Sequence, residues 1–578
     1  MSKVTADTAA AFCSTLVDEW RRGGVRDAVI CPGSRSTPMA LALVHHGGVR
    51  VSVRLDERGA GFFAVGLALA SGRPTVVLTT SGTAAAELHA AVVEAHHAGV
   101  PLIVCTADRP PELHDVGAPQ TIEQAQLFGR AVRWFADPGV PDEAARPAWR
   151  SFASRALAEA AGGPLGPGPV HLNLPFREPL LGQPGELPPG RSGGKPWHEV
   201  SAGATPDLGQ LEEHLRPGVR GLVVAGRRPG QSSADVAALA AALAWPVLAD
   251  PPSGGRVASP YVVAAADALL RDEGFAAEMT PEVVLRIGDP WASKVLAGWL
   301  SRTAAAGAVH VALDADWTWK DPGRDVSVRA RRAWVTRASS GPPPSGPWLE
   351  RWAKAEAAAQ GAIDGVLAGH FEATEPGVAR ALFAHVPAEG CIVASSSMPV
   401  RELEWFARPR ADPPRVLANR GANGIDGVVS TTLGVAASGA AGAVFGLVGD
   451  LAVLHDASAL VRPVAVAPAM ASVIVVLDND GGGIFNFLPQ ATELPTAEFE
   501  LLFGTPQLPA VADLARACGY CVREITEAGE LEPALAAARR DASAGGLPAF
   551  VVVDTDRTAN VALHAEIEAA VKAAVNGL

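Results

Sequence analysis

The sequence predicts an α/β protein made of three doubly wound parallel-sheet domains. Its 578 residues are enough for two to four domains of about 150 residues each. Short apolar runs, polar turns and helix-like stretches alternate along the whole chain, a pattern typical of parallel sheets covered on both faces. Two stretches rich in Pro and Gly, 182–196 and 339–347, interrupt this alternation and are typical of linkers. We therefore expect domains over 1–185, 198–338 and 348–578.

The first third carries four strand-like runs, each ending in a polar turn. They are Asp27–Cys31, Val51–Leu55, Thr75–Leu78 and Leu102–Cys105. In parallel sheets, ligands gather at the carboxyl ends of the strands. The polar residues just after these runs are therefore candidate site residues: Ser34, Arg35, Glu57, Ser81 and Arg109.

The middle and last thirds repeat this pattern. Strand-like runs in the middle third are Gly221–Ala225, Val283–Ile287 and Val309–Leu313. Those in the last third are Cys391–Ala394, Arg415–Ala418, Ala443–Val448, Ser472–Leu477 and Ala549–Val553. Three sheets of similar size fit this spacing better than one long sheet.

Composition and charge argue against several classes of protein. Lys and Arg number 48 against 61 Asp and Glu, a formal charge of −13, so a generally nucleic-acid-binding surface is not expected. Met1–Ala10 has no basic region followed by an apolar run, which predicts a cytoplasmic protein without a secretory signal. The uncharged stretch Gly427–Gly449 is rich in small residues, and we expect buried helix and strand there instead of a membrane span. Cys518 and Cys521 are expected to be reduced core thiols, because no second Cys pair or nearby His completes a zinc site.

Two strand ends in the last third carry oxygen ligands. One strand-like run ends at 449–451 (Gly-Asp-Leu), and the next ends at 478–481 (Asp-Asn-Asp-Gly). The Asp450 carboxylate, the Asn479 amide oxygen and a backbone carbonyl near Gly481 would form a hard site suited to Mg²⁺. Two ordinary polar turns are the alternative, because a Gly-Asp followed at such a distance by Asn is common.

The same segment resembles the thiamine diphosphate and magnesium motif, which is Gly-Asp-Gly, about two dozen residues, and then Asn. Here 26 residues, Ala452–Leu477, separate the two parts. Leu451 replaces the second Gly of the motif and Asp478 replaces a frequent Asn, but Asp450 and Asn479 stand at the ligand positions. The resemblance implies thiamine diphosphate together with Mg²⁺ or Mn²⁺, and the three metal ligands named above.

Thiamine enzymes place a carboxylate beside the aminopyrimidine ring of their cofactor, on a residue that follows a strand. Glu57 has a similar position after a predicted strand. The resemblance implies that Glu57 hydrogen-bonds the ring nitrogen and so makes the cofactor's own amine a base. The alternative is that the acidic pair Asp56 and Glu57 only caps a helix, since acids are favoured in a first turn.

Six sequence blocks, in order and spanning nearly the whole chain, resemble one particular family of thiamine enzymes. They are Cys31–Pro38, Asp56–Arg58, Thr80–Ala84, Thr106–Leu113, Asn419–Gly427 and Gly481–Phe485. Together they resemble the 2-succinyl-5-enolpyruvyl-6-hydroxy-3-cyclohexene-1-carboxylate synthases of menaquinone biosynthesis. The resemblance implies a transferase that decarboxylates 2-oxoglutarate, adds the succinyl unit to isochorismate and releases carbon dioxide. It also implies an aminopyrimidine-binding, a central and a diphosphate-binding domain, each a parallel sheet of the thiamine diphosphate enzyme type.

The resemblance assigns roles to residues by their position in these blocks. Both substrates are dianions, so their site must collect positive charge despite the net charge of −13. Residues implied for substrate binding are Ser34, Arg35, Arg109, Gln120, Lys294, Ser397, Arg401, Arg420, Phe485 and Leu488. Residues implied for cofactor binding are Glu57, Ser81, Ile425, Asp450, Leu451, Asn479, Gly481 and Ile484. By the same resemblance, Ile425 supports the bent shape of the cofactor, and an apolar wall beside the reacting centre is formed by Ile484, Phe485 and Leu488.

Several alternatives remain open from the sequence. Arg35 could solvate a turn, and Arg401 could pair with Glu402 or Glu404 on a helix surface. Another thiamine enzyme, such as an acetolactate synthase-like carboligase or a 2-oxoacid decarboxylase, would keep the cofactor residues, and so would a catalytically silent binding protein on this fold. Because the family's cofactor lies between subunits, the resemblance also implies a homodimer or homotetramer with active sites at the interface, and neither nucleic acid nor membrane as a partner.

Overall fold

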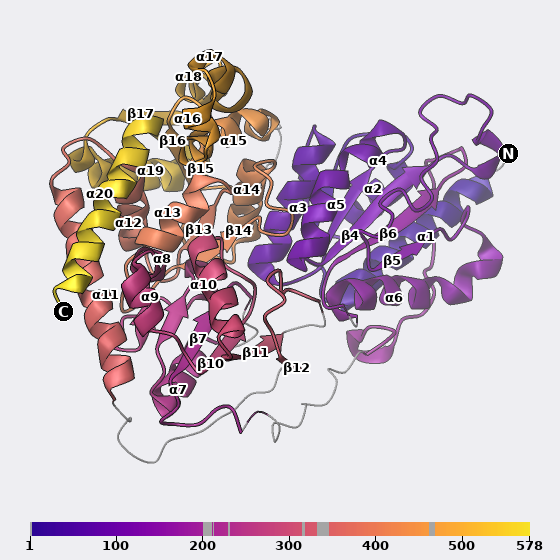
Figure 1. Ribbon diagram of the computed structural model, residues 1–578. Helices are drawn as coiled ribbons and strands as arrows, with labels where there is room; N and C mark the ends of the chain where they lie inside the picture. The colour runs from indigo at the N-terminus through magenta and orange to yellow at the C-terminus, as the bar shows by residue number, and fades with distance from the viewer. Residues whose placement is uncertain are drawn as a thin grey trace. The chain divides into compact units, whose positions relative to one another are not determined.

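The computed structural model describes residues 3–163, 165–199, 211, 213–228, 232–314, 318–331, 346–461 and 469–578. The chain divides into two compact units, each assembled from separate stretches of sequence. Unit 1 comprises Met1–Ala202, Asn419–Ala441 and Leu454–Ser472. Unit 2 comprises Gly203–Ala418, Gly442–Val453 and Val473–Leu578, and Figure 1 colours the chain by residue number.

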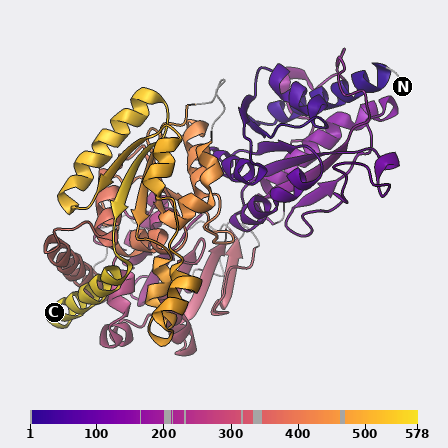
Figure 2. The ribbon, with the colours of Figure 1, turned by 90° about the horizontal axis from the view of Figure 1, so that it is seen from above.

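Unit 1 is built on a six-stranded sheet with the order β2-β1-β3-β4-β6-β5, in which every pairing is parallel. Its strands are β1 (Asp27–Ile30), β2 (Arg50–Val53), β3 (Thr75–Thr79), β4 (Leu102–Asp108), β5 (Trp134–Ala136) and β6 (Pro169–Pro175). Its helices are α1 (Lys3–Arg22), α2 (Thr37–His45), α3 (Glu57–Ser71), α4 (Thr83–Glu87), α5 (His89–Ala98), α6 (Trp149–Gly162) and α14 (Val428–Ser438). The central strands are buried along their whole length because helices cover both faces, with α3 and α5 on one face and α1 and α6 on the other (Figures 1 and 2).

One core of unit 1 lies between the sheet and helices α1, α2 and α6. Phe12 of α1 and Trp149 of α6 are buried there with their ring centroids 5.5 Å apart in an edge-to-face arrangement. Trp20 is also buried, and its indole N–H donates to the Ala153 carbonyl oxygen at 3.1 Å. This packing fixes the sheet whose strand ends carry the candidate residues of unit 1.

Helix α14 packs against α3, although it comes from the last third of the chain. A Cβ on Gly66 of α3 would lie 2.1 Å from the Thr431 carbonyl oxygen, and one on Gly434 would lie 2.1 Å from the Phe63 carbonyl oxygen. The two helices therefore approach backbone to backbone, which only Gly permits. The stretch 427–449 forms α14 and strand β15 (Val444–Gly449), which confirms the prediction of buried helix and strand.

None of the helices in the described parts of the chain is long and apolar enough to cross a membrane.

Unit 2 contains two further six-stranded sheets, both parallel throughout. The central sheet has the order β12-β11-β10-β7-β8-β9, with β7 (Gly221–Ala225), β8 (Val247–Ala249), β9 (Val262–Val263), β10 (Val283–Ile287), β11 (Val309–Asp314) and β12 (Val328–Arg331). The C-terminal sheet has the order β14-β13-β15-β16-β18-β17, with β13 (Cys391–Ala394), β14 (Arg415–Ala418), β15, β16 (Val473–Asp478), β17 (Cys521–Ile525) and β18 (Ala549–Asp554). The predicted fold class of three parallel α/β sheets is confirmed.

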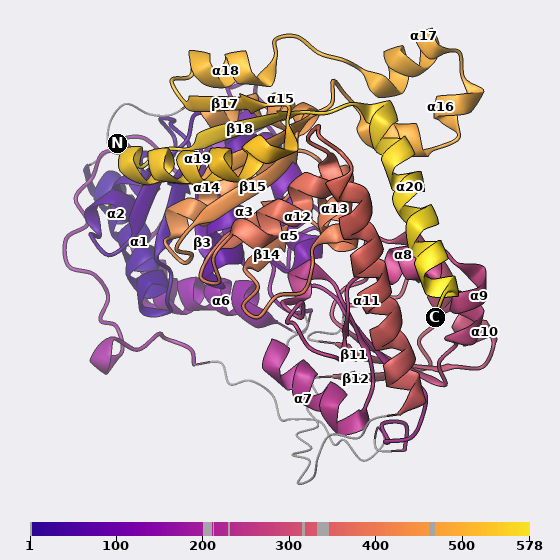
Figure 3. The ribbon, with the colours of Figure 1, turned by 90° about the vertical axis from the view of Figure 1, so that its left-hand side faces the viewer.

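The helices of unit 2 join its two sheets into one packed body. They are α7 (Ser233–Leu243), α8 (Ala266–Leu270), α9 (Glu273–Glu278), α10 (Lys294–Ala305), α11 (Pro347–Ala368), α12 (Glu375–His385), α13 (Met398–Phe406), α16 (Gln490–Glu493), α17 (Thr496–Phe499), α18 (Val511–Ala517), α19 (Leu531–Gly545) and α20 (Arg557–Asn576). A further helix, α15 (Asp450–His455), begins in the sequence of unit 2 and ends in that of unit 1. Trp352 of α11 and Val571 of α20 share a buried cluster with Val284 of the central sheet. Figure 3 shows α19 lying along β17 and β18.

The predicted linkers and cysteines have different outcomes. The stretch 182–196 contains one short 3₁₀ turn, Ser192–Gly194, whereas most of the second predicted linker, 339–345, lies outside the described residues. The predicted domain bounds therefore stay predictions.

The prediction of two core thiols is wrong, because Cys518 is only half-buried and Cys521 is exposed on β17, an edge strand that pairs with β18 alone.

Candidate functional site

The two predicted strand ends of the C-terminal sheet meet. Strand β15 ends at Gly449, pairs with Leu477 of β16, and passes directly into helix α15 at Asp450. The Asp450 side chain is buried, and its Oδ2 atom accepts a hydrogen bond from the Gly481 backbone N–H at 2.7 Å. The carboxylate is thereby fixed beside the loop that follows β16.

The environment of Asp450 disfavours a bare negative charge. Burial, with Asp478 and Asp480 nearby, raises the pKa of Asp450 to about 7, although backbone hydrogen bonds from Leu451 and Gly481 oppose the rise. A divalent cation would stabilise the charged form of this carboxylate.

Asn479 adds a second side-chain oxygen to this loop. Its side chain is 8% exposed, and its Nδ2 atom donates to Glu375 Oε1 at 2.7 Å. Its Oδ1 atom is buried without a hydrogen-bond partner among the described residues. An orphaned acceptor next to a buried carboxylate fits a cation ligand, since buried oxygens otherwise find donors.

Gly481 is required by its conformation and by its packing. Its φ is +135°, and a Cβ there would lie 1.9 Å from the Gly504 carbonyl oxygen. The neighbouring Gly482 N–H donates to that same oxygen at 2.8 Å. A π-helical turn, Glu500–Gly504, thus braces the loop 479–483.

The described residues contain no group of three or more His, Cys, Asp or Glu side chains that could hold a metal. The predicted ligand set includes one carboxylate, one amide and one backbone carbonyl, so it is not a group of that kind. The Gly481 carbonyl oxygen already accepts from the Gly483 N–H at 3.0 Å, which leaves its second lone pair for a cation. The residues present therefore fit a magnesium site of the predicted composition.

The predicted substrate residues of unit 2 lie on helices and loops that belong to both of its sheets. Ser397 precedes α13 with a φ of +72°, and Arg401 of the first turns of α13 donates to the Ser397 carbonyl oxygen at 2.6 Å. The acidic neighbours proposed as surface partners of Arg401 are engaged elsewhere: Glu402 with His564 at 3.0 Å, and Glu404 with the Ala292 N–H at 2.7 Å.

The predicted apolar wall lies on the loop after β16. Ile484 and Phe485 belong to a 3₁₀ turn, Gly483–Phe487, and Leu488 follows it. All three side chains are half-buried, and the rings of Phe485 and Phe503 pack with their centroids 5.3 Å apart. Leu451, predicted to bind the cofactor, is the second residue of α15 and is also half-buried.

Lys294 lies on α10, a helix that follows strand β10 of the central sheet. It is the exposed first residue of α10, where the Ser293 hydroxyl caps the helix by accepting from the Leu296 N–H at 2.9 Å. A cavity of about 310 Å³ opens beside α10, lined by residues that include Asp289 and Trp291. Lys294 is not among the residues that line it.

Glu57 in unit 1 stands at the first position of α3, the helix that follows β2 in the chain. Asp56 is the capping residue, because its Oδ1 atom accepts from the Arg58 N–H at 2.9 Å. Glu57 is half-buried, and burial, with Asp56 and Glu87 nearby, raises the pKa of its carboxyl. The helix cap is therefore supplied by the neighbour, and Glu57 is an additional acid in the first turn.

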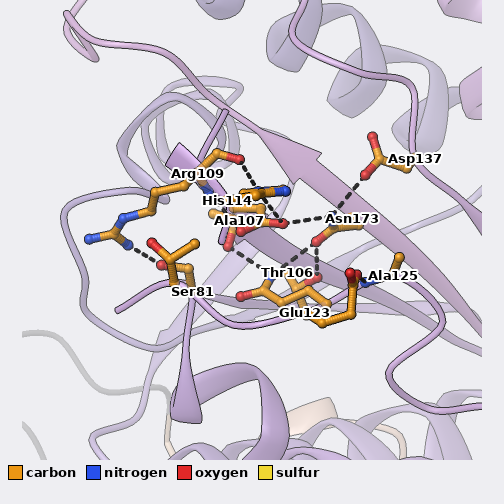
Figure 4. A network of polar contacts seen from close by, with 12 residues as sticks. Ser81, Thr106, Ala107, Arg109, His114, Glu123, Ala125, Asp137 and Asn173 are labelled. Carbon is orange, nitrogen blue, oxygen red and sulfur yellow. Dashed lines mark hydrogen bonds and ion pairs between the residues drawn. The ribbon is translucent and has the colours of Figure 1, made fainter. Parts of the chain in front are cut away.

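Ser81 and Arg109, predicted from two different strand ends, are in contact. The Arg109 guanidinium donates to the Ser81 hydroxyl, as Figure 4 shows. The Arg109 backbone is held on both sides, by Asp108 Oδ1, which accepts from its N–H at 2.7 Å, and by His114 Nε2, 2.9 Å from its carbonyl oxygen. Burial, with Arg35 nearby, lowers the pKa of Arg109, so two cations gather at this edge of the sheet.

Arg35 is buried, so the alternative of a turn-solvating side chain is wrong. It donates to the Phe176 carbonyl oxygen at 2.9 Å and pairs with Glu178 at 3.2 Å. Ser34 beside it is exposed, and its carbonyl oxygen accepts from the Thr37 N–H at 3.1 Å.

A buried polar network below Ser81 and Arg109 was missed by the sequence analysis. Gln124 Oε1 accepts from the Gly82 N–H at 2.9 Å, and its Nε2 atom donates to Asn173 Oδ1 at 2.9 Å. Asn173 in turn donates to Asp108 Oδ2 at 2.9 Å, in the network drawn in Figure 4. The signal in the sequence is the pair of polar residues His171 and Asn173 inside the otherwise apolar strand β6.

Three further predicted residues lie in loops of unit 1. Gln120 is exposed with a φ of +53°, and its carbonyl oxygen would lie 3.4 Å from a Cβ on Gly82. Arg420 and Ile425 are half-buried in the turn between β14 and α14. That turn is held by Glu94 of α5, which accepts from two of its backbone N–H groups at 2.8 and 2.6 Å.

Comparison with known proteins identifies the relatives of this chain. Residues 12–127 match the family model "Thiamine pyrophosphate enzyme, N-terminal TPP binding domain", and residues 194–393 match "Middle domain of thiamine pyrophosphate". Thiamine pyrophosphate is another name for thiamine diphosphate.

Relatives are similar over nearly the whole chain. A protein of Thermobifida fusca is 43% identical over 98% of this chain and 99% of its own length. One of Chloroflexus aurantiacus is 42% identical over 96% and 95%, and one of Geobacillus kaustophilus is 42% identical over 87% and 88%. All three are named 2-succinyl-5-enolpyruvyl-6-hydroxy-3-cyclohexene-1-carboxylate synthase. With this similarity and the geometry above, the chain belongs to the family of these synthases, which are thiamine diphosphate enzymes.

Proposed function

We propose that the protein decarboxylates 2-oxoglutarate and adds the succinyl unit in a 1,4 sense to isochorismate, as a transferase of menaquinone biosynthesis. The products are 2-succinyl-5-enolpyruvyl-6-hydroxy-3-cyclohexene-1-carboxylate and carbon dioxide. The observation that carries this proposal is the buried Asp450 carboxylate beside the orphaned Asn479 oxygen, in a chain whose relatives bear the name of this synthase.

The proposed cofactor is thiamine diphosphate with Mg²⁺ or Mn²⁺. Asp450, Asn479 and the backbone of Gly481 would hold the metal, and Leu451 and Ile484 would line the cofactor. When bound, the cofactor would supply a nucleophilic carbon and a positively charged ring that can take up the electrons released with carbon dioxide. Glu57 holds a proton at the ring nitrogen in this proposal, and burial raises the pKa of its carboxyl.

In this proposal, charged side chains bind the substrate carboxylates and apolar side chains exclude water. We assign the dianionic substrates to Arg35, Arg109, Arg401 and Arg420, because guanidinium groups bind carboxylates through paired hydrogen bonds. Ser34, Gln120, Lys294 and Ser397 complete the proposed polar set. Phe485 and Leu488 keep water away from the reacting carbon.

The proposed assembly is a homodimer or a homotetramer. Its support is the division of the proposed cofactor residues, with Glu57, Ser81 and Ile425 in unit 1 and the metal loop in unit 2. A cytoplasmic location stays a prediction from the sequence.

The proposed activity is tested by incubating the full-length protein with Mg²⁺, thiamine diphosphate, 2-oxoglutarate and isochorismate, and detecting the adduct by mass. Omission of isochorismate should stop product formation. A second incubation replaces 2-oxoglutarate by pyruvate. Acetolactate or an aldehyde formed faster than the succinyl adduct would assign the chain to another thiamine carboligase or decarboxylase, and cofactor binding without any product would indicate a silent binding protein.

A further inference from the structure

We propose that Glu375 is a positioning residue for the metal site: it fixes the Asn479 side-chain amide so that the carbonyl oxygen, and not the amide nitrogen, is left as the free ligand. This inference rests on the proposed function, because it concerns the same metal site. It adds a residue that the sequence analysis did not single out.

The hydrogen bond between the two side chains decides which way the amide lies. Asn479 Nδ2 donates to Glu375 Oε1 at 2.7 Å, and the Thr555 hydroxyl donates to the same oxygen at 3.5 Å. A carboxylate oxygen carries no hydrogen and can only accept, so Glu375 Oε1 selects the NH₂ end of the amide. The Asn479 oxygen then points away from Glu375 and is the buried orphan noted above.

The surroundings make the alternative orientation costly. Glu375 is 1% exposed and Asn479 is 8% exposed, so water cannot replace a lost hydrogen bond on either side chain. A flipped amide would set two oxygens against each other in a buried site, and a buried polar clash of this kind is expensive.

Helix geometry holds Glu375 in place. It is the first residue of α12, with Thr374 as the capping residue, whose hydroxyl accepts from the Gly377 N–H at 3.2 Å, and Pro376 follows. Pro at the start of a helix has its backbone angle already set. The carboxylate therefore projects from a rigid helix end toward the loop after β16.

Glu375 has little to stabilise its own charge. The Oε2 atom of Glu375 is buried and has no hydrogen-bond partner in the described part of the chain. Glu402 is itself fully buried and accepts from His564 Nε2 at 3.0 Å. A buried acid this poorly compensated weakens the fold, and orienting the metal ligand accounts for its presence.

Metal binding provides the test, with a readout that does not depend on turnover. Free Mn²⁺ is followed by electron paramagnetic resonance while it is titrated into the full-length protein at saturating thiamine diphosphate. In Glu375→Gln the new side chain offers either a donor or an acceptor, so the Asn479 amide is no longer fixed. Loss of such a supporting partner typically weakens metal affinity about 10- to 100-fold, and we expect a loss in that range.

Glu402→Gln is the matched control, because Glu402 is equally buried and loses the same charge but is not hydrogen-bonded to Asn479. We expect it to keep the Mn²⁺ affinity within about threefold of the wild type. Equal losses in both variants would mean that buried negative charge, and not amide orientation, sets the affinity, and would overturn the proposal.

A swap of the two polar groups gives a second test. In the double variant Glu375→Gln with Asn479→Asp, a Gln nitrogen can donate to an Asp oxygen, and the total charge is unchanged. We expect this variant to recover most of the affinity, whereas Asn479→Asp alone, with two carboxyl groups facing each other, should lose it. This comparison still decides the matter if Glu375→Gln fails to fold, which circular dichroism would reveal.

The outcomes separate this inference from the proposed function. A wild-type protein that binds no Mn²⁺ with thiamine diphosphate would remove the proposed cofactor site itself. A wild-type protein that binds Mn²⁺, with Glu375→Gln binding equally well, would overturn only the role of Glu375.

Discussion

At the scale of single residues, Glu57 is the side chain on which the proposed chemistry depends most. Glu57→Gln keeps the size of the side chain but cannot share a proton in the same way, so turnover should fall about 10²- to 10⁴-fold while the cofactor still binds. Hydrogen–deuterium exchange at the cofactor's reactive carbon, measured by quenched NMR, reports the step directly. Because Asp56 supplies the helix cap, stability should hardly change. Exchange as fast as in the wild type would remove Glu57 from its proposed role.

His171 predicts a pH dependence of stability. Burial lowers the pKa of His171 to about 3, whereas an unfolded His titrates near 6.5. At a pH between about 3 and 6.5, the unfolded chain therefore binds a proton at His171 that the folded chain does not bind. The free energy of unfolding falls as the pH drops below about 6.5, and the loss is about 2 kcal/mol at pH 5.

The prediction for His171 is tested by thermal melting at pH 7 and pH 5. His171→Gln removes the titrating ring, so its melting temperature should fall less between the two pH values than that of the wild type. The comparison within each protein cancels the general cost of the substitution. Parallel pH curves for the two proteins would show that His171 does not contribute.

At the scale of elements, the close approach of α3 and α14 predicts that a Gly-to-Ala substitution in the contact lowers stability, whereas one in an open helix position raises it. Gly66→Ala would place a Cβ 2.1 Å from the Thr431 carbonyl oxygen, so the helices must move apart, at a cost typically of about 1–3 kcal/mol. Gly361→Ala in α11 is the control, because a Cβ there meets nothing within 4 Å and should stabilise the helix by up to about 1 kcal/mol. Melting temperatures that move in the same direction would contradict this account of the contact.

Strand ends were predictable from the sequence, but the side chains that support them were not. Asp450 and Asn479 follow apolar runs, so their place at neighbouring strand ends could be read from the alternation of runs and turns. Glu375 looks like any acid at the start of a helix, and Gln124 lies in a loop with no pattern. Each acquires its role only from a contact with a distant part of the chain, which composition and periodicity do not record.

Three sheets were foreseen from the spacing of strand-like runs, whereas the assignment of α14 to the first sheet was not. The Pro- and Gly-rich stretches from which linkers are predicted are local features of the sequence. The Gly66 and Gly434 contact has no such local mark, because glycines also occur in turns and loops.

At the scale of the whole molecule, the proposed shared active site predicts complementation between two inactive variants. Glu57→Gln and Asp450→Ala alter different units of the chain. If each site takes Glu57 from one subunit and Asp450 from another, a mixed dimer contains one intact site. Random exchange in an equal mixture should then restore about a quarter of the wild-type activity, because half of the dimers are mixed and half of their sites are intact.

The complementation test needs the subunits to exchange, so the two variants are co-expressed with different affinity tags and purified through both. The mixed dimer should have about half the activity of the wild type. Activity no higher than the mean of the two parents would mean that each site is completed within one chain, and a monomer in solution would remove the proposed assembly.

The packing of α14 on α3 limits how the protein can be divided or recombined. A fragment ending at residue 185 would contain the first sheet but lose α14, and the face of α3 around Phe63 and Gly66 would lie open to solvent. Such a face invites aggregation. The first sheet is therefore not an interchangeable module: a chimaera that replaces it with the corresponding part of a relative should fold well only if the α14 segment is exchanged along with it.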